Sequence, residues 1–194
     1  MTNNFDIIKD LLEFESEDDF YFLQILKRKK ENPELGSNSV VVKTYYIKSL
    51  ENLDIKRDEI INLCQLYNAR AYINLNVRSF ESVAFHMLKK VTDIIMNKDY
   101  KSVRNAYDSV CGAHGTGKNK KWIIDIDNTN EEYDREMREF INTECRPVGM
   151  KIIANIPTKN GHHLITNCFD LMKFREKYPD VEIHKNNPSV IYVP

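Results

Sequence analysis

Apolar positions in the first half of the chain predict a mixture of helices and strands. In the first 30 residues they recur at intervals of three and four, from Ile7 to Leu26, which predicts a helix ending in the basic run 27–30. We interpret that run as a solvated helix end, where the helix dipole favours cations. Runs of β-branched and aromatic residues then predict strands between further helices. The expected elements are a strand over 39–47, a helix over 56–66, a strand over 69–77, a helix over 80–96 capped by Ser79, and a second helix ending at Cys111.

From residue 122 onward the pattern becomes sharper. A capping box of Thr129 and Glu132 opens a helix that ends before Pro147. The expected elements are a strand over 122–127, a helix to residue 144, strands over 150–156 and 162–167, a helix over 169–178, and strands over 181–184 and 190–193. The order β-α-β-β-α-β, followed by an edge hairpin, is that of the split ferredoxin-like unit.

This order predicts an α+β fold with a ferredoxin-like, or RRM-like, antiparallel sheet. Such a sheet carries helices on one face and leaves the other face free for a site. We expect a catalytic core over residues 70–194 and an N-terminal extension over residues 1–69, made of a helix and a strand–helix pair. The strands at 40–47 and 71–77 either extend the core sheet or form a small adjoining one.

Composition and charge exclude several classes of protein. The chain has 194 residues, a formal net charge of −1, 42% hydrophobic and 29% charged residues, as in an ordinary globular protein. No run approaches the ~20 apolar residues of a membrane span, and the acidic start lacks the basic region of a signal peptide. We therefore expect a cytoplasmic protein with no membrane partner. The four cysteines form no CxxC pair, so neither a zinc knuckle nor a disulfide framework is predicted.

The near-zero net charge conceals an uneven distribution. Residues 1–19 carry seven carboxylates against one lysine, a net charge of −6, whereas residues 98–121 carry six cations against two carboxylates, a net charge of +4. The balance argues against strong non-specific nucleic-acid binding, which comes mainly from lysine and arginine at phosphates. A net charge near zero is still compatible with a local basic patch that faces phosphate.

Two carboxylates mark the first candidate site. Asp125 and Asp127 stand two residues apart in an apolar strand, so both project from the same face. Adjacent carboxylates repel unless a cation lies between them, and the hard divalent ions Mg²⁺ or Mn²⁺ are their natural partners. The alternative is a strand end with two solvated acids.

Two later segments carry further candidates. A glycine turn at 158–161 leads into a strand that begins with His162 and His163, of which only one can share the face of the two acids. Glu182 lies between two β-branched residues of a later strand, with Asp180 and His184 as competing choices. The first and third strands of a ferredoxin-like unit are central neighbours and the fourth pairs beside the first, so Asp125, Asp127 and Glu182 are expected to meet.

These three segments resemble the motifs of the archaeo-eukaryotic primase superfamily, particularly its primase-polymerase domains. The matching stretches are WIIDID, TKNGHHLI and DVEIHKNNPSVIYVP, and the resemblance covers about residues 70–194. It implies that Asp125, Asp127 and Glu182 are catalytic metal ligands for Mg²⁺ or Mn²⁺, and that His163 contacts the phosphates of a nucleotide. Lys159 and Lys185 are the lysines expected to neutralise triphosphate charge.

The resemblance further implies a two-metal nucleotidyltransferase that makes or extends a primer from nucleoside triphosphates in DNA replication. Its expected partners are nucleoside triphosphates, a single-stranded DNA template, and a replication helicase or another replication protein. One alternative is a catalytically weak replication accessory, or a nucleic-acid-binding module, on the same fold. Another is a phosphatase of the D-x-D-x-T type, because residues 125–129 are DIDNT.

Overall fold

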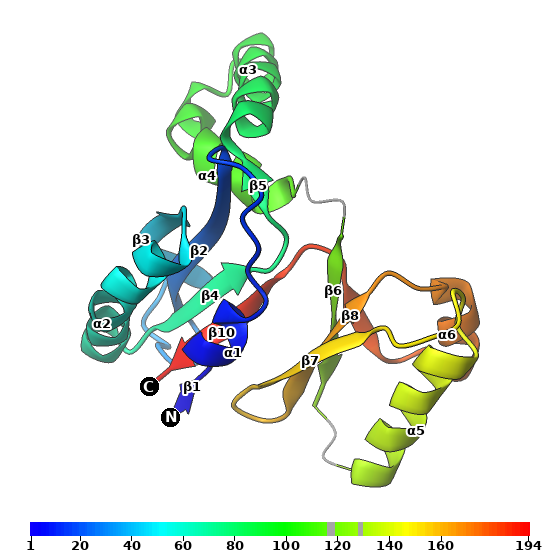
Figure 1. Cartoon of the computed structure of the whole chain (residues 1–194). Coiled ribbons are helices and arrows are strands. Elements are labelled where there is room, and N and C mark those ends of the chain that lie inside the picture. The colour runs from blue at the N-terminus through cyan, green and yellow to red at the C-terminus, as the bar shows by residue number, and fades with distance from the viewer. Residues whose placement is uncertain (116–118, 128–129) are drawn as a thin grey trace.

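Two antiparallel sheets organise the chain (Figure 1). The computed structural model describes residues 1–115, 119–127 and 130–194. The larger sheet has the order β1-β10-β4-β2-β3, and a short strand, β5, also pairs with β2. The strands of this sheet are β1 (Thr2–Asn3), β2 (Asp19–Arg28), β3 (Ser39–Ile47), β4 (Arg70–Asn74), β5 (Arg78–Ser79) and β10 (Pro188–Val193).

Helices cover both faces of β2 in the larger sheet. The helical elements of this half are α1 (Phe5–Lys9), α2 (Leu50–Tyr67), α3 (Phe80–Met96), the 3₁₀ helix η1 (Tyr100–Asn105) and α4 (Ala106–Ala113). Side chains of α1 and α2 share one core with Leu23 and Ile25 of β2, whereas α3 and α4 share another with Phe20 and Phe22. Ser79 caps α3 by accepting a hydrogen bond from the Ser82 N–H at 3.0 Å, which confirms the predicted start of this helix.

The smaller sheet has the order β7-β8-β6-β9, with every neighbouring pair antiparallel. Its strands are β6 (Lys121–Ile126), β7 (Ile152–Pro157), β8 (His162–Asn167) and β9 (Glu182–His184). The helices α5 (Glu131–Thr143) and α6 (Leu171–Lys177) pack together on one face of this sheet (Figure 1). Trp122, Ile124 and Ile126 of β6 form a core with Met137 of α5 and Phe174 of α6.

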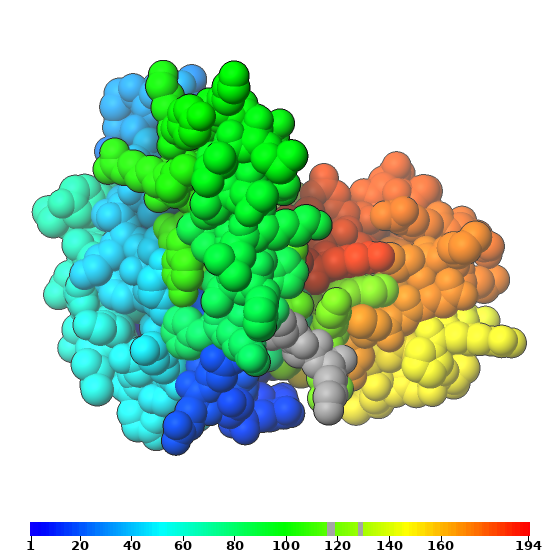
Figure 2. Space-filling model, turned by 90° about the horizontal axis from the view of Figure 1, so that it is seen from above, coloured from blue at the N-terminus to red at the C-terminus, as the bar shows by residue number. Residues whose placement is uncertain are grey.

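The second face of the smaller sheet meets the larger half of the molecule. Ile123 of β6, Ile156 of β7 and Ile165 of β8 belong to the same buried core as Ile73 of β4 and Val190 of β10. Figure 2 shows the two halves in contact seen from above. The face of the smaller sheet that was expected to be open is therefore covered along its middle by the larger half. The end of this face around Asp125 and His163 remains available for a site.

The predicted N-terminal helix over the first 30 residues is wrong. The structure has only the short helix α1 there, and residues 19–28 form the strand β2. Because β2 lies between β3 and β4 and is buried on both faces, its near-continuous apolar run does not alternate. Three apolar residues at a spacing of three therefore imitated a helix.

Other departures concern strand placement. Of the two alternatives for the strands at 40–47 and 71–77, the structure has the adjoining sheet, but this sheet, which contains β3 and β4, is the larger of the two. β10 joins them there rather than forming a hairpin at the edge beside β9. β4 lies within the range expected to be the catalytic core, so the two sheets do not divide the chain at residue 69. The predicted capping residue Thr129 lies outside the described residues, and Asn130 caps α5 by accepting from the N–H groups of Glu132 and Tyr133.

In the described part of the chain, no helix has both the length and the apolar character needed to cross a membrane.

Candidate active site

A row of acidic and imidazole side chains crosses three strands of the smaller sheet. The backbone register places Asp125 of β6 opposite His163 of β8 on one side and Glu182 of β9 on the other. Residues paired directly across antiparallel strands project from the same face. Asp125 therefore lies between His163 and Glu182 in one row across the sheet, on the same face as both.

The side chains of Asp125, Glu182 and His184 are close enough to one another to hold one cation. The ligand atoms of Asp125, Glu182 and His184 all lie within 4.8 Å of one another. His184 pairs with Ile123 in the next row, on the same face, and its Nε2 is 3.4 Å from Glu182 Oε2. Two carboxylates and one imidazole suit a divalent ion such as Mn²⁺ or Mg²⁺, with oxygen donors in the majority.

Asp127 occupies a different position from the one expected for the triad. It lies one residue past the end of β6, is exposed, and is not part of the group formed by Asp125, Glu182 and His184. Asp127 nevertheless lines two cavities together with Asp125. It therefore lies beside the group of Asp125, Glu182 and His184 without belonging to it.

His163 is held between the two sheets. Its Nδ1 is 2.9 Å from the hydroxyl of buried Ser189 at the start of β10, and its Nε2 is 3.6 Å from Asp125 Oδ1. Burial lowers the pKa of His163, although the Asp125 carboxylate opposes this shift. His162 points to the other face, where its Nε2 is 3.4 Å from Asp134, so the alternation predicted for the two histidines is confirmed.

The turn before β8 closes tightly against the end of β6. The Thr158 N–H donates to the Gly161 carbonyl at 2.9 Å, and the Gly161 N–H donates to Thr158 Oγ1 at 3.1 Å. A Cβ atom on Gly161 would stand 3.0 Å from the Asp127 Cα and would overlap the Ile126 carbonyl oxygen. Glycine at this position lets the turn carry Lys159 alongside the acids.

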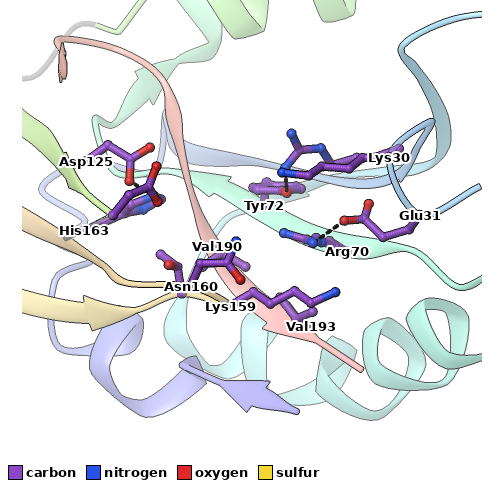
Figure 3. A pocket seen from close by; sticks show the side chains of 13 residues that line it. Lys30, Glu31, Arg70, Tyr72, Asp125, Lys159, Asn160, His163, Val190 and Val193 are labelled. Atoms are coloured by element: carbon purple, nitrogen blue, oxygen red, sulfur yellow. Dashed lines mark hydrogen bonds and ion pairs between the residues drawn. The ribbon is translucent and has the colours of Figure 1, made fainter. Parts of the chain in front are cut away.

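Three cavities converge on Asp125. The first, of about 400 Å³, lies between the acids and the larger sheet, and Figure 3 shows Lys30, Arg70 and Tyr72 across it from Asp125 and His163. A second, of about 380 Å³, shares Arg28, Tyr72, Asp125 and His163 with the first. A third, of about 320 Å³, lies on the other side between Asp127, Tyr133 and Glu182.

The two predicted lysines lie in different places. Lys159 lines the first cavity with Asp125 and His163, near the acids as the sequence predicts. Lys185 instead lies over the indole ring of Trp122, with Nζ 5.1 Å from the ring centroid, and lines a separate cavity with Asn76 and Lys120. The structure does not bring Lys185 to the acid row.

The contribution of the larger sheet to the site was not predicted from the sequence. Arg28, Lys30, Arg70 and Tyr72 line the first cavity, although the basic run 27–30 was interpreted as a solvated helix end. Ser189 was missed as well, because β10 was expected at the edge of the smaller sheet. The available signal was the basic run 27–30 itself, which begins in the last two residues of the strand β2 rather than at the end of a helix.

Comparison with protein-family models, with curated proteins and with solved structures finds no match to this chain.

Proposed function

We propose that this chain is a primase-polymerase-like nucleotidyltransferase that joins nucleoside triphosphates into a primer on single-stranded DNA in the cytoplasm. The observation that carries the proposal is the row of His163, Asp125 and Glu182 across three adjacent strands, at the junction of three cavities. A divalent-cation site beside a cavity with cationic walls suits a substrate that carries several phosphates.

The arrangement of the smaller sheet supports the same proposal. Its central neighbours are β6 and β8, and β9 pairs beside β6, as a ferredoxin-like unit requires. Both helices lie on the face away from the acids (Figure 1). The three segments that resemble primase motifs thus fall on the strands and the turn that surround Asp125.

The donor set fits divalent cations. In the proposed reaction Asp125, Glu182 and His184 would hold one ion, and Asp127 with Asp125 would hold another. Bound cations supply charge neutralisation and a lowered pKa for the attacking hydroxyl. The primer 3′-hydroxyl gives up its proton to water, its oxygen attacks the α-phosphorus, the bond from the α-phosphorus to the bridging oxygen breaks, and pyrophosphate leaves. His163, oriented by Ser189, would donate a hydrogen bond to the phosphates, and Lys159 would neutralise their charge.

The phosphatase alternative meets a structural objection. That class needs the first aspartate at the end of a parallel strand in a Rossmann-like core. β6 pairs antiparallel with both of its neighbours. Residues 128 and 129 of the DIDNT stretch lie outside the described residues, so the objection rests on the sheet alone.

The proposal is tested by nucleotide incorporation on single-stranded DNA with Mg²⁺ or Mn²⁺. We expect metal-dependent products from the wild type and none from Asp125→Asn or Glu182→Gln, which keep side-chain size but remove charge. Glu176→Gln, an exposed substitution on α6, is the matched control and should retain activity. Products of equal yield from all variants would overturn the assignment of the acid row.

Absence of product from a folded wild-type protein would overturn the polymerase proposal itself. Measurement of single-stranded DNA binding on the same samples then decides the remaining alternative. Binding that survives Asp125→Asn would favour the replication accessory or nucleic-acid-binding module, with a helicase or another replication protein as its partner.

A further inference from the structure

The larger sheet presents a cationic wall to the site. Arg28 ends β2, Arg70 begins β4, and the pairing of Leu26 with Arg70 and of Gln24 with Tyr72 places Arg28, Arg70 and Tyr72 on one face of the sheet. All three line the first cavity, and Lys30 lies beside them (Figure 3).

Several of these cations make no direct ion pair in the part of the chain that the structure describes. Arg70 forms an ion pair with Glu31. Within the described residues, by contrast, Arg28, Lys30 and Lys159 make no ion pair. Glu31 also lines the cavity and interacts electrostatically with Arg28 as well as pairing with Arg70. Apart from Asp125 and Asp127, the described lining thus holds one carboxylate against the four cations Arg28, Lys30, Arg70 and Lys159, and this excess of positive charge favours an anion there.

Arg28 has the most defined position among these cations. Its Nη1 donates to the Tyr72 hydroxyl at 3.1 Å, and this hydrogen bond raises the pKa of the Arg28 guanidinium. Arg28 and Tyr72 also line the second cavity with Asp125 and His163. The guanidinium thus lies at the junction of two cavities, across from the acids, and its remaining donors are available to a ligand.

The two walls of the first cavity carry opposite charge. Asp125 and Asp127 lie on one side, and the remainder is bordered by Arg28, Lys30, Arg70 and Lys159 with Glu31 among them. A ligand complementary to both sides is an anion that also binds divalent cations, and a polyphosphate has both properties. The volume of about 400 Å³ lies in the range of small-molecule sites, so the cavity suits a small ligand rather than a duplex.

We propose that Arg28, Lys30 and Lys159 form a polyphosphate-binding site in which Tyr72 orients Arg28. The inference rests on the proposed function only for identifying the polyphosphate as that of a nucleotide. Arg28 and Lys30 lie in residues 1–69, outside the segments that resemble primase motifs, so this part of the chain supplies two of the three proposed cations.

Binding of inorganic tripolyphosphate in the presence of Mg²⁺, measured by calorimetry, tests the site without any turnover. We expect saturable binding by the wild type and at least about tenfold weaker binding by Arg28→Ala. Lys27→Ala is the matched control, because it removes the same charge from the opposite face of the same strand and lies outside the cavity. This control should bind as the wild type does.

Tyr72→Phe separates orientation from charge. It removes only the hydroxyl that holds Arg28, so tripolyphosphate binding should weaken by a few-fold while the circular dichroism spectrum and unfolding midpoint stay near those of the wild type. Equal affinity of wild type and Arg28→Ala would overturn the proposal, as would equal losses in Arg28→Ala and Lys27→Ala.

A second arm distinguishes a polyphosphate from nucleic-acid phosphates. Binding of a thymidine oligonucleotide without a 5′-phosphate should be less affected by Arg28→Ala than tripolyphosphate binding. The reverse pattern would assign the cationic wall to the nucleic-acid strand and overturn the proposal. Tripolyphosphate binding that depends on Arg28, without nucleotide incorporation, would defeat the proposed function but leave this site standing.

Discussion

Replacement of Gly161 by alanine tests how tightly the turn is packed against the acid row. The added Cβ would stand 3.0 Å from both the Ile126 carbonyl carbon and the Asp127 Cα, and would overlap the Ile126 carbonyl oxygen. Optimal carbon–carbon separations are about 3.5–4.0 Å, so the turn must move by at least about half an ångström. Overpacking of this kind costs about 1–3 kcal/mol.

The backbone atoms that the Cβ meets belong to the residues flanking the end of β6, so they cannot yield by a rotamer change. At about 2–4 °C per kcal/mol for a chain of this size, Gly161→Ala should lower the unfolding midpoint by roughly 2–12 °C. Displacement of Lys159 and Asp127 should also reduce nucleotide incorporation more than the loss of folded protein explains. Differential scanning fluorimetry and the incorporation assay measure the two effects.

Gly36→Ala is the matched control. A Cβ on Gly36 meets no atom within 4 Å, so this variant should be neutral or slightly stabilised, by up to about 1 kcal/mol. If Gly161→Ala and Gly36→Ala unfold at the same temperature as the wild type and incorporate nucleotides equally well, the described packing of the turn is refuted.

Three further predictions follow from individual side chains. Ser189→Ala leaves the His163 ring without its hydroxyl partner, so urea unfolding should show a loss of about 1–3 kcal/mol; unchanged stability would contradict the contact. Cys168 is the one exposed thiol among the four cysteines, so one thiol per chain should react rapidly with Ellman's reagent, and four after denaturation; rapid reaction of more than one in the folded protein would be inconsistent with the burial. Burial raises the pKa of Tyr21 to about 12, so the folded state retains a proton that the unfolded state loses above about pH 10. The contribution of Tyr21 to the free energy of unfolding should therefore be complete below about pH 10 and decline towards pH 12. The difference in free energy of unfolding between the wild type and Tyr21→Phe should shrink over the same pH range. A difference that stays constant would contradict this prediction.

The elements that local patterns specify were predictable from the sequence. The helix α3 begins at the predicted Ser79 cap, and β6, β8 and β9 lie where alternation and turn residues placed them. The pairing of Asp125 with Glu182 followed from these strands and the expected strand order. These features depend on neighbours in sequence and on a single sheet, which is why one sequence was enough.

The contribution of the larger sheet was not predictable in the same way. β2 is covered on both faces, so its apolar residues carry no strand alternation. β10 pairs with β4 across more than 110 residues of intervening chain, and no local pattern encodes that choice. As a result Arg28, Tyr72 and Ser189 reach the site through tertiary contacts alone.

The most direct test of the central claim is the binding of Mn²⁺ to the purified protein, followed by electron paramagnetic resonance, because it depends on neither template nor nucleotide. The acid row predicts saturable binding by the wild type, binding weakened by about tenfold or more in Asp125→Asn and in Glu182→Gln, and unchanged binding in Glu176→Gln. Equal Mn²⁺ affinity in all four proteins, or no saturable binding by the folded wild type, would contradict the assignment of Asp125 and Glu182 as a metal site.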